Sequence, residues 1–201
     1  MSKEIRWRVI TLQGVLVVVL AFGAGFLFWA NSFTTGMVRD QLTAQQIYFP
    51  GKDQIKAGGA LDPAEFPQEI RDQAGNQVTT GDQARIYAND FIGIHLQKVA
   101  NGLTFAQITP AIAKLDKNSP TYAADSAKLT AAKATLFQGE TLRGLLLQAY
   151  AWWTMGVYAL YAAIGLALAT LAVFAAFVFE LLFAPRIERP TIRTLHEAKV
   201  A

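Results

Sequence analysis

Hydrophobic residues along this chain gather in two long uncharged runs, separated by a mixed and more polar middle. The first run extends over residues 9–30 and the second over residues 149–179. A helix needs about 20 apolar residues to cross the hydrocarbon core of a bilayer, and both runs reach this length. The pattern predicts a mainly α membrane protein whose two transmembrane helices form a hairpin.

Aromatic residues mark the ends of the runs. Trp7 and Trp29 bracket the first run at a separation of roughly 33 Å of helix, close to one hydrocarbon thickness. The second run begins with Tyr150, Trp152 and Trp153 as its aromatic belt. Because this run is longer than one span needs, we expect it to tilt or to project as helix beyond the membrane. The first run exceeds the apolar core of a signal peptide and lacks a suitable A-x-A site, so we expect an uncleaved anchor.

Charges at the two ends predict the orientation of the hairpin. Residues 1–8 and 184–201 each carry a net charge of +2, whereas residues 34–148 carry as many acidic as basic residues. Short segments rich in Lys and Arg stay on the cytoplasmic side, so we expect a bacterial plasma-membrane protein with both termini cytoplasmic. The expected organisation is a cytoplasmic tail at 1–8, transmembrane helices at 9–30 and 149–183, an extracytoplasmic domain at 31–148, and a cytoplasmic tail at 184–201.

The extracytoplasmic domain is expected to be small and mostly helical. Residues 50–81 are rich in Gly and Pro and predict a long irregular loop, with a short β pair between residues 76–80 and 46–49. A loop of this length usually covers or binds something. Apolar residues recur at helical spacing before and after it, which predicts a helical domain over the hairpin.

Capping signals predict where the helices of this domain begin and end. Asp82 is placed to cap a helix that Gly102 ends. Thr104 and Gln107 have the spacing of a capping box, which predicts the start of the next helix. Pro120 suits the first turn of a last helix that continues into the second apolar run.

Small residues in both apolar runs predict close helix packing. Small side chains let backbones approach each other where lipid supplies no hydrophobic driving force. One stripe suffices for the hairpin, and a second stripe indicates an interface with another protein; the alternative is that alanine is simply common in membrane helices. The candidate interface residues are Ala21 and Gly25 in the first run, Ala159, Ala163 and Ala167 on one stripe of the second run, and Gly165 and Ala169 on another.

A charged pair precedes the second run, in the stretch "LFQGETLRGLLLQAYAWW" (136–153). Glu140 and Arg143 are three residues apart, so they share a helix face and are placed to pair. An exposed pair of this kind contributes only a few tenths of a kcal/mol. We therefore expect the pair to dock the extracytoplasmic domain, or a partner protein, at the membrane edge.

Candidate catalytic chemistry is scarce in this sequence. It contains no cysteine and two histidines, His95 and His196, which the expected topology separates by the membrane. There is no phosphate loop, no nucleophile elbow and no H-E-x-x-H motif. His95 and Asp90 are weak candidates for a metal or proton-transfer site, because a spacing of five does not put them on one helix face. We expect no enzymatic activity, no catalytic or cofactor-binding residues, and no cofactor.

Three stretches resemble a group of two-span membrane proteins of high-GC Gram-positive (actinobacterial) bacteria. They are "VRDQLTAQQIYFP" (38–50), "GLTFAQIT" (102–109) and "LFQGETLRGLLLQAY" (136–150). The resemblance covers the edges of the domain and the spans. It implies the two-span architecture, and the family has no established activity. The name ring-opening dioxygenase is sometimes attached to such proteins, but the two histidines of this chain argue against that chemistry.

These observations favour a non-catalytic accessory subunit that binds and stabilises a larger membrane protein complex, of respiratory or membrane monooxygenase type. Its expected partners are the lipid bilayer and other integral membrane subunits. A net charge of +3 is too small to indicate nucleic-acid binding. The alternative is an extracytoplasmic ligand-, lipid- or metal-binding or sensing module anchored by the two spans. A third hypothesis, an enzyme acting through His95 and nearby carboxylates, has the least support.

Overall fold

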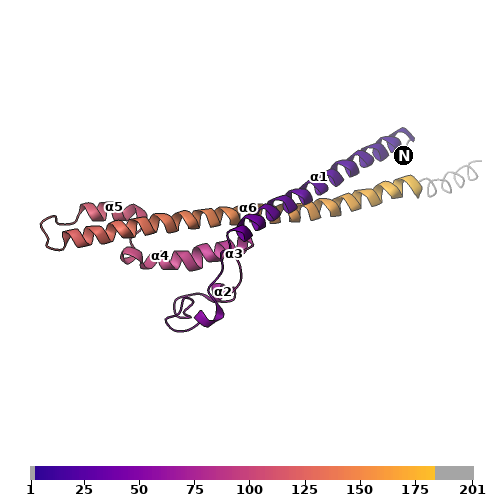
Figure 1. Ribbon diagram of the computed structural model, residues 1–201. Helices are drawn as coiled ribbons and strands as arrows, with labels where there is room; N and C mark the ends of the chain where they lie inside the picture. The colour runs from indigo at the N-terminus through magenta and orange to yellow at the C-terminus, as the bar shows by residue number, and fades with distance from the viewer. Residues whose placement is uncertain (1–2, 184–201) are drawn as a thin grey trace, which may run out of the picture. The chain divides into compact units, whose positions relative to one another are not determined.

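The computed structural model describes residues 3–183 and is mostly helical, with no strand among these residues (Figure 1). The helical elements are α1 (Lys3–Ala44), η1 (Lys52–Gln54), α2 (Gln68–Arg71), α3 (Gly81–Ile86), the π-helix η2 (Tyr87–Gly93), α4 (Ile94–Lys98), η3 (Val99–Gly102), α5 (Phe105–Ala113) and α6 (Tyr122–Leu182). The expected cytoplasmic tail at 184–201, with His196 and the basic residues that support its orientation, lies outside the described residues.

The chain divides into two compact units. Unit 1 is formed by the chain up to Phe33 and from Gly156 onward, and unit 2 is Thr34–Met155. Helices α1 and α6 contribute residues to both units, whereas the shorter elements all belong to unit 2.

Helices α1 and α6 are both long and apolar enough to cross a membrane. In unit 1 their large apolar side chains face outward: Val18, Phe22 and Leu168 are 68%, 76% and 62% exposed. A continuous apolar surface of this kind is not stable against water, and it is compatible with a lipid environment. The expectation of two apolar spans is confirmed to this extent.

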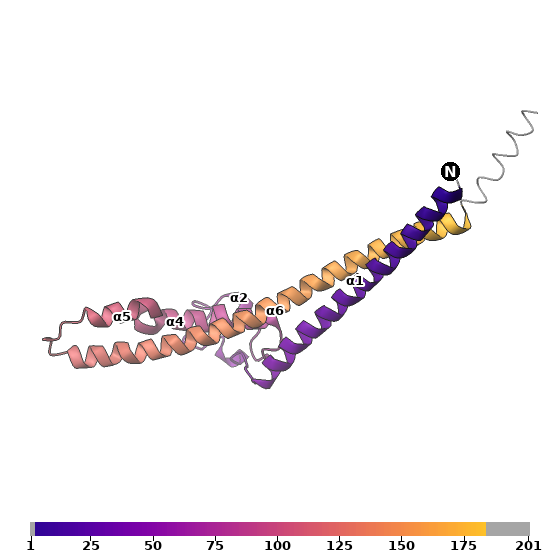
Figure 2. The ribbon, with the colours of Figure 1, turned by 90° about the horizontal axis from the view of Figure 1, so that it is seen from above.

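Within unit 1 the two helices run antiparallel and side by side (Figures 1 and 2). The amide nitrogen Nδ2 of Asn31 donates a hydrogen bond of 2.9 Å to the carbonyl oxygen of Gly156. Toward the other end, Arg6 donates to the backbone carbonyl of Glu180 and its guanidinium faces the Glu180 carboxylate. Arg6 is thus the charge partner of the Glu180 carboxylate within the hairpin.

Close packing of the hairpin involves Gly14 and Gly23. A Cβ atom on Gly23 would lie 3.3 Å from the Leu166 side chain, and one on Gly14 would lie 3.6 Å from the Phe177 ring. The expected pair Ala21 and Gly25 lies on another side of α1, where both residues are exposed. The face of α1 that contacts α6 therefore contains Gly23, which lies two positions from both Ala21 and Gly25.

The core of unit 2 draws heavily on its irregular loop. Leu61, Ile70 and Val78, all from the chain between α1 and α3, are fully buried, and they pack with Leu42 of α1 and Leu146 of α6 in one cluster. The glycines and prolines break regular structure, but the apolar residues between them fill the centre of the unit. The loop at 50–81 is therefore a core-forming segment.

The expected β pair is reduced to a single antiparallel bridge between Tyr48 and Gln77. The backbone nitrogen of Phe49 donates to the oxygen of Asn76, and that of Val78 donates to the oxygen of Ile47, both at 2.9 Å. These bonds join the two segments whose pairing the sequence predicts. The regular pairing ends at Asn76, because its backbone nitrogen donates to the Gln73 oxygen in a turn at 2.9 Å, and Gly75 donates to the Pro50 oxygen at 2.9 Å.

The N-cap of α3 differs from the residue expected from the sequence. Thr80, not Asp82, is the N-cap: its hydroxyl accepts from the Gln83 nitrogen, and the Gln83 side-chain oxygen accepts from the Thr80 nitrogen. The capping box satisfies two N–H groups that have no partner inside the helix. Gly81 then lies against Trp153 so closely that a Cβ atom would come within 2.2 Å of the Trp153 Cβ.

A second cluster, formed by Leu96, Ile108 and Leu136, joins α4, α5 and α6. Helix α5 begins at the expected capping box, where the Thr104 nitrogen donates to the Gln107 side-chain oxygen at 2.9 Å. Gly139 of α6 makes room for Leu96, since a Cβ atom there would lie 2.5 Å from a Leu96 methyl. Helix α6 begins at Tyr122, just after Pro120, as the sequence predicts.

Candidate functional site

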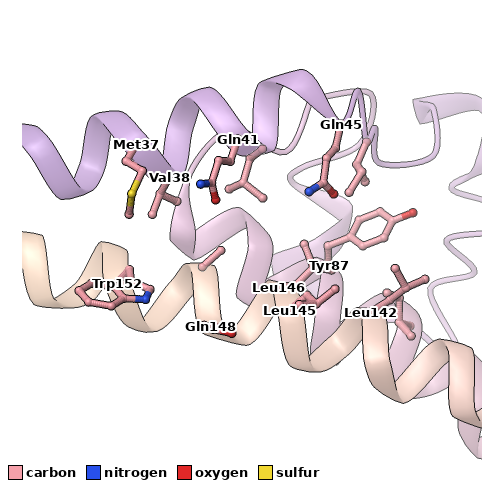
Figure 3. A pocket seen from close by; sticks show the side chains of 14 residues that line it. Met37, Val38, Gln41, Gln45, Tyr87, Leu142, Leu145, Leu146, Gln148 and Trp152 are labelled. Carbon is pink, nitrogen blue, oxygen red and sulfur yellow. The ribbon is translucent and has the colours of Figure 1, made fainter.

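Unit 2 contains a pocket of about 680 Å³ between the end of α1, the π-helix η2 and α6 (Figure 3). This volume lies within the usual range of small-molecule sites. The lining residues come from α1 and the chain that follows it (Met37, Val38, Gln41, Leu42, Gln45 and Ile47), from η2 (Tyr87 and Ile92) and from α6 (Leu142, Leu145, Leu146, Gln148, Ala149 and Trp152).

Helical spacing brings these side chains to one place. On α1 the lining residues recur every three or four positions, and the same period brings Leu142, Leu145, Leu146, Ala149 and Trp152 to one face of α6. Figure 3 shows these two faces turned toward each other, with Tyr87 between them. The amphipathic register noted in the sequence therefore builds a pocket wall.

The pocket has a buried floor and an exposed rim. Leu42 and Leu146 are only 3% and 6% exposed and belong to the core of unit 2. Leu142, Leu145 and Trp152 are 52%, 60% and 43% exposed, although they are large and apolar. Large apolar side chains that remain exposed around a cavity are typical of a ligand-binding or interaction surface.

None of the lining residues, all within the described chain, carries a formal charge at neutral pH. The polar groups are the amides of Gln41, Gln45 and Gln148 and the hydroxyl of Tyr87, whose pKa is raised above its usual value by burial. A phenol with a raised pKa stays protonated and neutral at physiological pH. The pocket is therefore apolar with a few neutral hydrogen-bonding groups.

Arg143 holds the π-helix that forms one wall of the pocket. Its Nε donates to the Ala88 carbonyl oxygen at 3.1 Å, and its Nη2 donates to the Asn89 Oδ1 at 3.3 Å. Its Nη1 donates to the Glu140 carboxylate at 2.9 Å. Gly93 of η2 lies beside the guanidinium, since a Cβ atom there would be 3.5 Å from the Arg143 Nε, an ordinary contact distance. Short π-helices are frequent at functional sites.

Glu140 and Arg143 contact each other and the π-helix. The two side chains form the expected pair, and Arg143 in addition anchors Ala88 and Asn89 of η2. Docking therefore occurs within unit 2 of the same chain. Contact of either residue with a partner protein stays a prediction.

Two aromatic residues of the expected belt, Trp153 and Tyr150, lie next to arginine side chains of unit 2. The Arg39 guanidinium lies 6.0 Å from the Trp153 ring centre, and Arg85 lies 6.0 Å from that of Tyr150. Trp152 lines the pocket. The first residues of the second apolar run thus pack within unit 2.

His95 and Asp90 have separate surroundings. The Nδ1 atom of His95 lies 2.8 Å from the Phe91 carbonyl oxygen, and its ring packs against Phe66 and Phe91. Burial and the neighbouring Glu69 raise the pKa of Asp90, while Arg85 partly opposes this rise. Within residues 3–183, no group of three or more His, Asp or Glu side chains is placed to hold a metal.

The small-residue stripes of α6 differ in exposure. Ala163 is 4% exposed and Ala159 is half-buried, whereas Ala167 of the same stripe is exposed. On the second stripe, Gly165 is exposed with open space around it and Ala169 is half-buried. Ala163 is thus packed within unit 1, and Gly165 is available to a neighbour.

Sequence reasoning missed the pocket residues Gln41, Gln45 and Gln148 and the role of Trp152. One signal was present: three uncharged polar residues interrupt apolar helix faces next to the spans. Their convergence needs the return of α6 past the end of α1, which no local pattern encodes.

Comparison of this chain with protein-family models, with curated proteins and with solved structures finds no match. The resemblance of the three stretches to two-span actinobacterial proteins therefore stays a prediction.

Proposed function

We propose that this protein is a membrane-anchored, non-catalytic binding module that holds the apolar chain of a lipid-like ligand in the pocket of unit 2. The observation that carries the proposal is the uncharged, largely apolar lining of a 680 Å³ pocket with exposed rim residues. Burying apolar surface contributes roughly 25 cal/mol per Å², so a hydrocarbon chain gains binding energy there without a charged partner.

The two apolar helices anchor the protein in a bilayer in this proposal. Their outward side chains and uncharged length support the anchoring. The equal positive charge of both ends supports cytoplasmic termini, and unit 2 is extracytoplasmic in this proposal. A charge-reversal experiment on residues 1–8, read out by the accessibility of a tag in unit 2, tests this orientation.

Entry of the ligand from the membrane fits the position of the lining residues in the chain. Met37 follows the first apolar run by seven residues, and Trp152 precedes Gly156, the first residue of α6 in unit 1, by four. In this proposal the lipid chain enters the pocket from the outer leaflet.

The test is to fill the pocket. Ala149→Phe places a ring in the cavity, whereas Ala134→Phe places the same ring on an exposed position of α6 outside the lining. We expect lipid that co-purifies in mild detergent, counted by native mass spectrometry, to be lost from Ala149→Phe and retained by Ala134→Phe. Equal lipid in the wild type and both variants, or none in the wild type even after lipid is supplied, contradicts the proposal.

A second candidate function is the accessory subunit of a larger membrane complex. The observation that favours it is the open space around Gly25 and Gly165, which leaves small-residue positions of unit 1 unused by the hairpin itself. Small residues of this kind let another transmembrane helix approach closely.

Gly25→Leu tests this second function, with Gly23→Leu as the matched variant. Gly25→Leu should abolish the recovery of a stoichiometric partner while the hairpin stays folded, since nothing lies within 4 Å of that position. Gly23→Leu should disturb the hairpin, because Leu166 lies against that glycine. Purification of the wild type as a lone monomer excludes the accessory function.

A further inference from the structure

The pocket also carries information about the polar end of its ligand. The amides of Gln41 and Gln45 point from α1 into the space between α1 and α6, beside Tyr87 (Figure 3). Gln148 lines the same space from α6. Among the described residues, no hydrogen bond to another side chain or backbone group holds these three amides or the Tyr87 hydroxyl. These groups are free to bind a ligand.

The two cations adjacent in sequence to lining residues, Arg39 and Arg143, do not line the pocket. Arg39 is exposed and lies over the Trp153 ring, and Arg143 donates to Ala88, Asn89 and Glu140. The lining itself contains no cation to neutralise a phosphate, sulfate or carboxylate. A charged group that leaves water without a partner costs several kcal/mol, so the pocket disfavours a charged ligand head.

An amide can donate and accept hydrogen bonds at once. Two amides from α1, one from α6 and a neutral phenol together match a head that contains carbonyl or hydroxyl oxygens. They offer no preference for a full charge of either sign. These polar groups are thus complementary to an ester, an amide or an alcohol.

We propose that the ligand is an uncharged amphiphile, with a single apolar chain or a pair of chains and a head of ester, amide or hydroxyl groups. This inference rests on the proposed function, since it assigns the head group of a ligand whose chain occupies the same pocket. Gln41 and Gln45 bind the head, and the apolar face of α6 binds the chain.

The experiment uses the full chain in nonionic micelles and three amphiphiles with the same oleyl chain. They are monooleoylglycerol, which is neutral, oleyl sulfate, which is anionic, and oleyltrimethylammonium, which is cationic. Binding is measured by titration of the wild type, with Ala149→Phe as the filled-pocket reference. We expect monooleoylglycerol to bind at least about tenfold more tightly than either charged compound, which corresponds to about 1.4 kcal/mol.

Two variants separate the head from the chain. The double variant Gln41→Leu with Gln45→Leu should lose the tenfold preference while it still binds the oleyl compounds. Gln148→Lys should raise the affinity for oleyl sulfate about tenfold and leave that for oleyltrimethylammonium reduced. Circular dichroism and the thermal midpoint of each variant check that unit 2 is folded.

The outcomes distinguish the two proposals. Equal binding of all three compounds to the wild type, with loss of all three in Ala149→Phe, overturns the assignment of a neutral head and leaves the apolar binding module standing. Binding that is undetectable, or unchanged in Ala149→Phe, overturns both. A preference for the neutral compound that survives in the double glutamine variant also overturns the assignment, because the head is then bound elsewhere.

Discussion

Units 1 and 2 use the same two long helices in opposite ways. In unit 1, Phe22 of α1 is 76% exposed and Leu168 of α6 is 62% exposed. In unit 2, Leu42 of α1 and Leu146 of α6 are 3% and 6% exposed. The same kind of residue on the same helix thus faces outward in one unit and inward in the other.

The difference shows what each unit needs from its surroundings. Unit 2 buries its apolar residues with help from the irregular loop and secures the wall of its pocket with Arg143. In unit 1 the two helices contact each other along one side, and the apolar side chains exposed on the other sides are compatible with a lipid environment. Changes to close contacts in unit 2 should therefore affect that unit alone.

The largest expected effect comes from Gly81→Ala. The new Cβ atom would lie 2.2 Å from the Trp153 Cβ, which cannot move without moving α6. Overpacking of this kind costs about 3 kcal/mol. We expect hydrogen exchange in unit 2 to accelerate strongly while exchange in residues 9–30 stays unchanged.

Gly36→Ala is the matched control, because no atom lies within 4 Å of the position that its Cβ would occupy. This variant should be neutral or slightly stabilising, as alanine favours helix over glycine by about 1 kcal/mol. Equal destabilisation by the two variants contradicts the close packing of α3 on α6.

The next effect separates the two members of the charged pair. Arg143→Met removes the hydrogen bonds to Ala88 and Asn89 and leaves a similar apolar stem. Hydrogen bonds from a charged donor contribute about 2 kcal/mol, so we expect faster amide exchange in η2 and a lower thermal midpoint of unit 2. Glu140→Gln removes only an exposed pair and should change stability by about 0.3 kcal/mol. Similar losses in both variants indicate that the ion pair, and not the contact with η2, anchors the wall.

A smaller effect compares two glycines on α6. Gly139→Ala must displace Leu96, whose methyl lies 2.5 Å from the new atom, and the flexible leucine relieves part of the clash. We expect a net loss of about 1 kcal/mol for unit 2. Gly144→Ala meets nothing within 4 Å and should stabilise the helix by about 1 kcal/mol. Denaturation of both variants in the same micelles measures the difference, and a shared sign contradicts the close approach of α4 to α6.

The smallest effect concerns pH. Burial and Glu69 raise the pKa of Asp90, so the folded state holds this proton more tightly than the unfolded state. The resulting stability is present below the unfolded pKa of about 3.9 and is lost as the pH rises through the folded pKa. Asp90→Asn should therefore stabilise the protein at pH 7 by about 0.5 kcal/mol after solvent screening, and have no effect near pH 3. The thermal midpoint at the two pH values measures this difference.

The sequence by itself determined the elements that depend on local chemistry. The two apolar runs predict α1 and α6, because length and hydropathy alone decide whether a helix suits a bilayer. The capping box at Thr104 and Gln107 and the start of the last helix after Pro120 were predicted correctly, because these signals act within one helical turn.

Only the tertiary structure decided which neighbours each element meets. The cap of α3 is an exception, because the Thr80–Gln83 capping box is as local as the one at Thr104, although the sequence also offers Asp82. The contact of Gly81 with Trp153 and the reach of Arg143 to Ala88 join residues more than fifty positions apart. The pocket exists because α6 returns past the end of α1 with its leucine face turned inward. Local patterns cannot specify such pairings, because an apolar helix face is compatible with many packing partners. Which partner it meets depends on the fold of the whole chain.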